Sequence, residues 1–272
     1  MYRHYFGFSE DPFNITPDPK FLFLSEEYNA ALTLLRYGIE QSKGFMVVTG
    51  EVGCGKTLLC RSLLQSLDED VVETAWLYSS NITQEQLIRS ILKEIGMPAT
   101  QLPETDHLEV LNEYLLEKIS SGKEILLIID EAQNLSYSLL ESIRLLSNLE
   151  TNQKKLLQIL LIGQPELKVK LNQPQLRQLK QRILVYYELH PLGIKATMQY
   201  INHRLNLVSQ QPGFPKITYG AFKRIFKYSQ GIPRVINNVC DKALMVSYAR
   251  LGKKLESSDV KHAIQDIERL SL

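Results

Sequence analysis

The chain lacks the long apolar segments that mark a membrane or secreted protein. None of its apolar runs approaches the roughly 18 residues of a membrane-spanning helix, and the longest, at 125–129 and 156–162, have the length of buried strands. The first six residues contain no apolar core of a secretory signal. We therefore expect a cytoplasmic protein with no membrane span of its own.

Cysteine and histidine are too few and too scattered for a disulfide framework or a zinc site. The three cysteines, Cys54, Cys60 and Cys240, form no close metal-binding or redox pair. The five histidines show no zinc-ligand spacing. A reducing compartment is the simplest interpretation.

A strong net charge is also lacking, but the charges are unevenly distributed. The formal net charge is +1. Residues 1–194 contain 18 Lys and Arg against 25 Asp and Glu, whereas residues 195–272 contain 13 against 5. The basic C-terminal part fits contact with nucleic acid, acidic lipid or an acidic protein face. It fits equally well docking onto the acidic N-terminal part and onto an anionic ligand.

The most informative segment is Gly-Glu-Val-Gly-Cys-Gly-Lys-Thr at 50–57, which matches the P-loop pattern G-x-x-x-x-G-K-[S/T] without a mismatch. An apolar run precedes it and a helical stretch follows, as the motif requires. The glycines let backbone N–H groups surround phosphate at the start of a helix. We expect Lys56 to reach the β- and γ-phosphates and Thr57 to ligate Mg²⁺. The expected nucleotide-binding residues are Gly50, Glu51, Val52, Gly53, Cys54, Gly55, Lys56, Thr57 and Leu58.

A second acidic motif follows the apolar run at 125–129, where Asp130 and Glu131 emerge from the end of a predicted strand. Ligands of open α/β sheets bind at that edge. We expect Asp130 to hold Mg²⁺ through water and Glu131 to polarise the water that attacks ATP. This arrangement corresponds to a Walker B strand, so the sequence predicts binding and hydrolysis of a nucleoside triphosphate.

Apolar runs of strand length alternate with helical patterns up to about residue 190, and no repeat or low-complexity linker interrupts them. This alternation predicts a parallel five-stranded α/β sheet flanked by helices. Beyond residues 190–193 the strand signals stop and four helical patterns follow. The predicted domains are an N-terminal lead-in and helix that packs on the nucleotide site (1–44), a P-loop ATPase core (45–190) and a smaller all-helical lid (191–272). The predicted strands are 45–49, 73–78, 125–129, 157–162 and 184–189.

Further polar residues follow the strands and helices of this scheme. Gln164 comes after the fourth strand, where its amide can sense the γ-phosphate or orient water. Arg177 and Arg182 flank a short helix, and either fits an arginine finger for a neighbouring subunit; we favour Arg182. Arg234 follows Gly-Ile-Pro at a helix start and is expected to contact the phosphates from the lid. Asn81, after the second strand, fits a contact that holds Glu131 inactive.

Together these positions resemble AAA+ ATPases, and more narrowly the ExeA/GspA (general secretion pathway protein A) family of secretion and pilus-assembly ATPases. The resemblance extends over essentially the whole chain. It implies a five-stranded core with a helical lid, Mg²⁺-dependent ATP turnover in a homo-oligomer, and Gln164 and Arg234 at the sensor 1 and sensor 2 positions. It also places Phe13 and Thr16 near the adenine. The matching segments are YFGF at 5–8, DPF at 11–13, TPDP at 16–19, GEVGCGKT at 50–57, DEAQNL at 130–135, RLLSNLET at 144–151, LLQILLIGQPEL at 156–167 and QLKQRI at 178–183.

The chain departs from that family in a few places. Cys54 stands where Thr or Ser is more usual, and Tyr28 where His is common. An acidic residue often found after the domain junction is missing at 195–197. Longer members continue into a membrane span and a peptidoglycan-binding domain, whereas this sequence ends at Leu272. It therefore resembles the short MSHA-biogenesis members of the MshM type.

Three functions remain open from the sequence. The first is an ATPase that supports assembly of a type II secretion system or a type IV pilus, together with assembly proteins at the inner membrane. The second is a DNA-associated AAA+ regulator of the transposition-ATPase type, which the basic lid favours. The third is a nucleotide-dependent scaffold with negligible turnover, against which the intact Glu131 argues.

Overall fold

The computed structural model describes residues 2–14, 16, 18–78, 83–97, 107–150, 155–210 and 214–270. They form two compact units that interleave along the chain. The first unit contains Met1–Glu26, Glu51–Leu58 and His190–Leu272, and the second contains Glu27–Gly50 and Leu59–Leu189. The division into 1–44, 45–190 and 191–272 that the sequence suggests stays a prediction.

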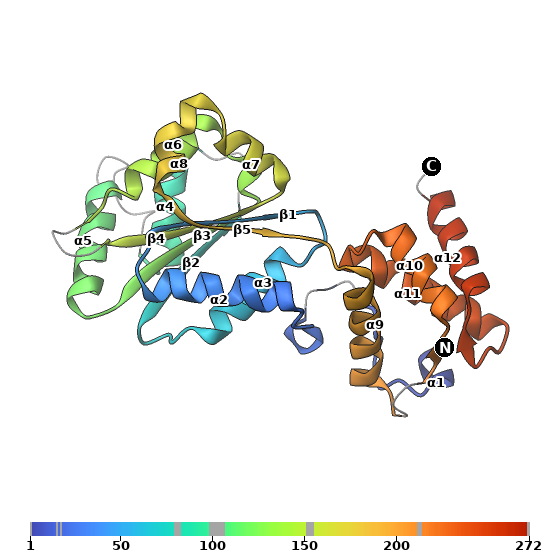
Figure 1. Ribbon diagram of the computed structural model, residues 1–272. Helices are drawn as coiled ribbons and strands as arrows, with labels where there is room; N and C mark the ends of the chain where they lie inside the picture. Colours follow the sequence, from blue (N-terminus) through green and yellow to red (C-terminus); the bar gives the residue numbers. More distant parts are fainter. Residues whose placement is uncertain are drawn as a thin grey trace. The chain divides into compact units, whose positions relative to one another are not determined.

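The second unit is built on a five-stranded parallel sheet with the strand order β2-β3-β4-β1-β5 (Figure 1). This confirms the predicted fold class. Each strand lies within one residue of its expected limits. Because all five strands are parallel, their carboxyl ends lie at one edge. The strands are β1 (Phe45–Gly50), β2 (Val72–Tyr78), β3 (Glu124–Asp130), β4 (Leu157–Gly163) and β5 (Ile183–Leu189).

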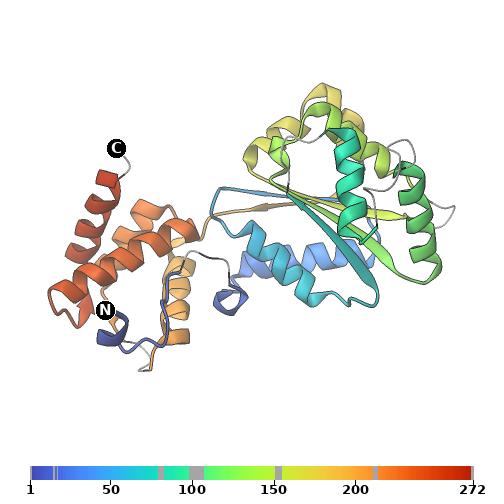
Figure 2. The same cartoon turned by 180° about the vertical axis from the view of Figure 1, so that it is seen from behind.

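Helices cover both faces of the sheet, which explains why its central strands are mainly apolar and almost entirely buried. One face packs α2 (Glu26–Glu40) and α3 (Lys56–Ser66), and the opposite face packs the helices between β2 and β5 (Figures 1 and 2). Gly38 allows α2 to approach closely, because a Cβ there would lie 2.7 Å from the sulfur of Met46. The second set is α4 (Gln84–Glu94), α5 (His107–Ser120), α6 (Tyr137–Leu146), α7 (Pro165–Leu171) and α8 (Arg177–Arg182), with the 3-10 turns η4 (Ala132–Asn134) and η5 (Pro174–Leu176).

The first unit contains the four predicted C-terminal helices: α9 (Ile194–Val208), α10 (Tyr219–Ser229), α11 (Pro233–Ala249) and α12 (Ser257–Leu270). It also contains one element that the all-helical prediction lacked. The strands β6 (Lys216–Ile217) and β7 (Lys254–Leu255) pair in parallel. Two residues are too few to give a strand periodicity, so the sequence pattern did not reveal them. None of the helices in the described ranges combines the length and apolarity needed to cross a membrane.

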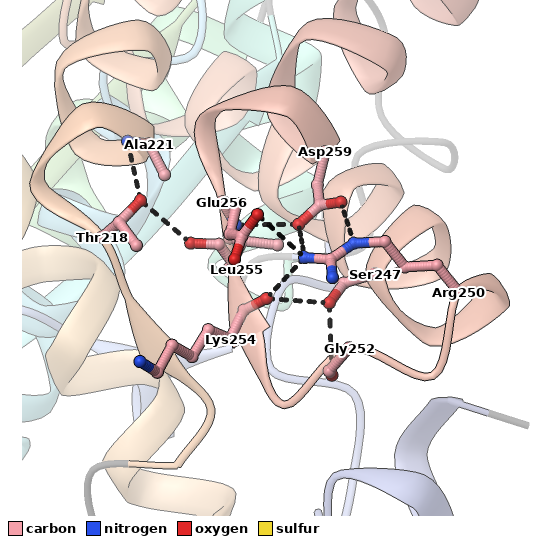
Figure 3. Close-up of polar contacts among 9 residues, drawn as sticks. All are labelled: Thr218, Ala221, Ser247, Arg250, Gly252, Lys254, Leu255, Glu256 and Asp259. Carbon is pink, nitrogen blue, oxygen red and sulfur yellow. Dashed lines mark hydrogen bonds and ion pairs between the residues drawn. The ribbon is translucent and has the colours of Figure 1, made fainter.

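A polar network joins α11, β7 and α12 within this unit (Figure 3). The Arg250 guanidinium donates two parallel hydrogen bonds to Asp259, of 2.6 and 2.7 Å. Asp259 also accepts the backbone N–H of Glu256 at the start of α12, over 2.8 Å. The Asp259 carboxylate is buried, so its charge is compensated by a guanidinium and a helix-terminal amide.

The N-terminal segment packs against the C-terminal helices of the same unit. This segment includes α1 (Tyr2–Tyr5) and the 3-10 turn η1 (Pro19–Phe21). Its aromatic side chains share a buried core with α9–α12. The buried Arg204 of α9 donates to the carbonyls of Pro12 and Asn14. Residues far apart in sequence thus form one core.

Candidate active site

The phosphate-binding loop follows β1 and ends where α3 begins at Lys56. Gly53 and Gly55 adopt φ angles of +84° and +96°, which residues with a Cβ rarely adopt. Lys56 is buried, and its Nζ donates to the Glu51 carbonyl over 3.1 Å, inside the loop. Cys54 is also buried. The backbone therefore has the curled conformation that the motif predicts.

The acidic pair lies at the carboxyl end of β3. Asp130 is 2% exposed, and its Oδ1 accepts the backbone N–H of Glu131 over 2.8 Å. Glu131 has φ 54° and ψ 36°, a left-handed conformation that is strained for a residue with a side chain. Such outliers cluster at functional sites because surrounding contacts impose them.

Two amide side chains contact the Glu131 carboxylate. Gln164, directly after β4, donates from Nε2 to Oε2 of Glu131 over 3.1 Å. Gln133 in η4 donates to the same oxygen over 2.6 Å. The structure therefore brings Glu131 and Gln164 into contact, which the sequence did not predict. Gln133 joins this pair. We call the three residues the Glu131–Gln133–Gln164 cluster.

A lysine of α7 fixes the backbone of the turn that follows Glu131. Lys170 Nζ donates to the carbonyls of Gln133 and Leu135, over 2.5 and 2.8 Å. No sequence pattern selected Lys170, because α7 is only seven residues long and was not predicted. Gln133 stood inside the quoted segment DEAQNL without a role, since only the fold brings η4 beside the end of β4.

Comparisons with known proteins agree with this geometry. A family model described as an AAA domain matches residues 39–171. The "General secretion pathway protein A" of Aeromonas hydrophila is 41% identical over 269 residues, which are 98% of this chain and 48% of that protein. The chain belongs to the AAA+ ATPases related to general secretion pathway protein A. It spans about half the length of that relative.

Solved structures share the fold at low sequence identity. Cdc6p from Pyrobaculum aerophilum superposes with a TM-score of 0.69 at 14% identity, over 97% of this chain and 70% of its own. ORC2 of Aeropyrum pernix gives a TM-score of 0.67 at 18% identity, over 95% and 72% of the two chains. These similarities establish the fold of the AAA+ chain and nothing about its substrate.

Arg234, the expected lid arginine, lies beside the phosphate-binding loop within the first unit. Its backbone N–H donates to the Gly53 carbonyl over 3.2 Å. A Cβ on Gly53 would lie 2.7 Å from the Arg234 Cβ, so only glycine allows this approach. The guanidinium of Arg234 is exposed.

The two candidate arginine fingers differ in their surroundings. Arg182 is half-buried, and its Nη1 donates to Ser147 Oγ over 3.0 Å. Arg177 is exposed at the start of α8. Both lie in the second unit, and the choice between them remains a prediction. Asn81 lies outside the described residues, so its expected contact with Glu131 also remains one.

The residues expected at the nucleotide site belong to both units. Lys56, Thr57 and Arg234 belong to the first unit, whereas Asp130 and Glu131 belong to the second. Phe13 is buried in the aromatic core of the first unit, and the backbone N–H of Thr16 donates to Asn14 Oδ1. Tyr28 and Cys60 are buried in the second unit, where burial raises the pKa of both groups. The roles predicted for Phe13 and Thr16 at the adenine stay predictions.

Proposed function

We propose that the chain binds and hydrolyses ATP and thereby supports assembly of a type II secretion or type IV, MSHA-like pilus apparatus. The observation that favours this role most is the 41% identity to general secretion pathway protein A over nearly the whole chain. The fold, the glycine-rich loop at 50–57 and the acidic pair Asp130 and Glu131 supply the chemistry that this role needs. Its partners would be assembly proteins at the inner membrane and further copies of the chain.

The loop at 50–57 and its flanking residue Leu58 bind the phosphates. The curled backbone offers N–H groups to phosphate oxygens, and α3 adds the positive end of its dipole. Lys56 supplies a cation for the β- and γ-phosphates. The residues present suit Mg²⁺, which prefers oxygen ligands and retained waters. The Thr57 hydroxyl would be one ligand, and the Asp130 carboxylate would hold waters of the ion. When bound, Mg²⁺ would supply positive charge against the charge that develops on the phosphates.

Water activation falls to Glu131, assisted by Gln164. A carboxylate within hydrogen-bond reach of water can accept its proton as the oxygen attacks phosphorus. Gln164 donates one amide N–H to that carboxylate over 3.1 Å. Its second side-chain N–H and its side-chain oxygen are suited to orient the water or the γ-phosphate. Arg182 supplies the additional cation to a neighbouring subunit, and Arg234 links the first unit to the phosphates.

Two substitutions test this assignment. Lys56→Ala should abolish ATP binding, measured by titration calorimetry in the presence of Mg²⁺, because the loop loses its cation. Glu131→Gln should retain ATP affinity but lose phosphate release by about two orders of magnitude or more. An unchanged ATP affinity in Lys56→Ala would refute the loop assignment, and normal turnover in Glu131→Gln would refute the role of Glu131.

The basic composition of residues 195–272, with 13 Lys and Arg against 5 Asp and Glu, favours a second candidate, a DNA-associated regulator. Phosphate contacts with DNA release counterions, so affinity would fall steeply with salt. An electrophoretic shift assay on duplex DNA from about 50 to 200 mM salt separates the candidates. Tight, salt-sensitive binding favours the regulator, and its absence favours the assembly ATPase.

A further inference from the structure

The turn after β3 is joined to the end of β4 through the side chain of Gln133. Its Nε2 donates to Glu131 over 2.6 Å, and its Oε1 accepts the backbone N–H of Gln164 over 3.0 Å. Gln164 completes the cluster, because its own Nε2 donates to the same Glu131 oxygen over 3.1 Å. A closed set of three hydrogen bonds thus joins residues from two strand ends.

The position of the Gln133 amide is tightly constrained. A Cβ at Gly163 would lie 2.9 Å from Gln133 Oε1 and 2.8 Å from Leu167 Cδ2, so glycine is what lets the amide reach residue 164. The turn's backbone is held independently by Lys170, which donates to the Gln133 and Leu135 carbonyls. Backbone and side chain of Gln133 are therefore both anchored to the β4–α7 segment.

We propose that Gln133 is a positioning residue for ATP hydrolysis: it fixes the Glu131 carboxylate beside Gln164 and couples the two. This inference rests on the proposed role of Glu131 as the group that activates water. The contacts of the cluster explain the left-handed backbone at Glu131, since a strained conformation persists only where neighbouring contacts impose it. Gln133 and Gln164 both donate to one carboxylate oxygen, so both amides act on the position of the same group.

The most discriminating substitution is Gln133→Glu. It keeps the side-chain length and an oxygen that accepts the Gln164 N–H, but it replaces the donor to Glu131 with a second carboxylate. Like charges at this distance repel, so Glu131 should leave its position while the fold remains. We expect kcat to fall about tenfold or more, with KM and the ATP dissociation constant within about twofold of wild type, because the binding loop is untouched.

The matched control is Gln175→Glu. Gln175 is exposed in η5 of the same unit, so this variant adds the same charge without reaching the cluster and should turn over like wild type. Thermal unfolding followed by the fluorescence of Trp76, which lies on β2 opposite Ile128 of β3, checks that both variants keep the sheet. Trp76 is the single tryptophan of the chain.

A double-mutant cycle tests the coupling itself. If Gln133 and Gln164 act through one Glu131 carboxylate, Gln133→Ala and Gln164→Ala should be non-additive. The double variant should lose less kcat than the product of the two single losses. Multiplicative losses, or a wild-type kcat in Gln133→Glu, would overturn the proposed role of Gln133.

The outcomes separate this inference from the proposed function. If Glu131→Gln abolishes turnover and Gln133→Glu does not change it, only the role of Gln133 falls. If wild-type protein releases no phosphate above the Glu131→Gln background, in the presence of ATP and Mg²⁺, both the hydrolytic function and the inference fall. A selective loss of kcat in Gln133→Glu, with ATP affinity retained, supports both.

Discussion

At the scale of single residues, the Glu73 carboxylate shows how local contacts set a pKa. Glu73 accepts hydrogen bonds from Lys118 Nζ, over 2.6 Å, and from the Tyr114 hydroxyl. Burial acts to raise the pKa of Glu73, but these two hydrogen bonds outweigh it and hold the pKa below its ordinary value. The same ion pair raises the pKa of Lys118. Glu73 therefore contributes stability above its unfolded pKa of about 4.3.

Glu73→Gln should remove that pH-dependent contribution. Its stabilisation is lost as pH falls through the lowered folded-state pKa. We expect the variant to lose about 1 kcal/mol of unfolding free energy at pH 7 and to show a weaker decline between neutral and acid pH. Trp76 lies on the same strand as Glu73, so urea unfolding followed by its fluorescence measures the change. Glu113→Gln, exposed on α5, is the control; equal pH dependence in both variants would contradict the assignment.

Gly53 offers a second residue-level prediction. Gly53→Ala should weaken ATP binding about tenfold or more, because it combines a φ of +84° with a contact of 2.7 Å to the Arg234 Cβ. Calorimetric titration with ATP and Mg²⁺ measures the loss. Gly96 has a φ of +80° but nothing within 4 Å of an added Cβ, so Gly96→Ala imposes the strain without the clash. ATP affinity equal in the two variants would refute the requirement for glycine at position 53.

At the scale of elements, the polar network of Figure 3 holds together the end of α11, the strand β7 and the start of α12. The ends of α11 and α12 meet at Asp259, which is 1% exposed and accepts from Arg250 and from the Glu256 N–H. Breaking the ion pair of a buried carboxylate lowers stability more than breaking that of an exposed one. The network therefore stabilises the first unit without touching the phosphate-binding loop.

Asp259→Asn should destabilise the first unit by about 2 kcal/mol, because it removes the charge that pairs with Arg250. Hydrogen exchange resolved by mass spectrometry should show faster exchange in α10–α12, while Trp76 fluorescence of the second unit changes little. Asp266→Asn serves as the comparison, since Asp266 on the same helix is exposed and lies 3.9 Å from Arg269. Unaltered protection of α12 in Asp259→Asn would refute the stabilising role.

Sequence patterns predicted the elements whose chemistry is local. The five strands were found because each centres on a short run of consecutive apolar or aromatic residues. The P-loop and the Asp130–Glu131 pair were found because phosphate and magnesium chemistry dictates their residue types and spacing. These signals need no knowledge of tertiary contacts.

The features that were missed depend on tertiary contacts or on very short elements. Gln133 acquires its partner only when η4 and the end of β4 come together. The seven residues of α7 and the two-residue strands β6 and β7 are too short for a periodic signal. Arg204 looks like a surface arginine of α9 in the sequence, yet it is buried because the N-terminal segment supplies carbonyl partners.

At the scale of the whole molecule, the arginine finger is expected from another copy of the chain. An arginine supplied by a neighbouring subunit would make ATP turnover depend on assembly, because a subunit without a neighbour lacks one cation for the charge that develops on the phosphates. A chain with a defective loop can still supply its arginine to a neighbour. This separation of roles makes the trans contribution measurable.

Mixing two inactive variants tests that arrangement. Arg182→Ala should lose turnover by about a thousandfold, as expected when an arginine finger is removed, and Lys56→Ala should lose it through failure to bind ATP. In a mixture, an Arg182→Ala subunit with an intact loop can receive Arg182 from a Lys56→Ala neighbour, so phosphate release should recover in part and peak at intermediate ratios. Arg177→Ala, mixed in the same way, assigns the finger between the two arginines. Absence of recovery at every ratio, for both arginines, would mean that no arginine of α8 acts in a shared site.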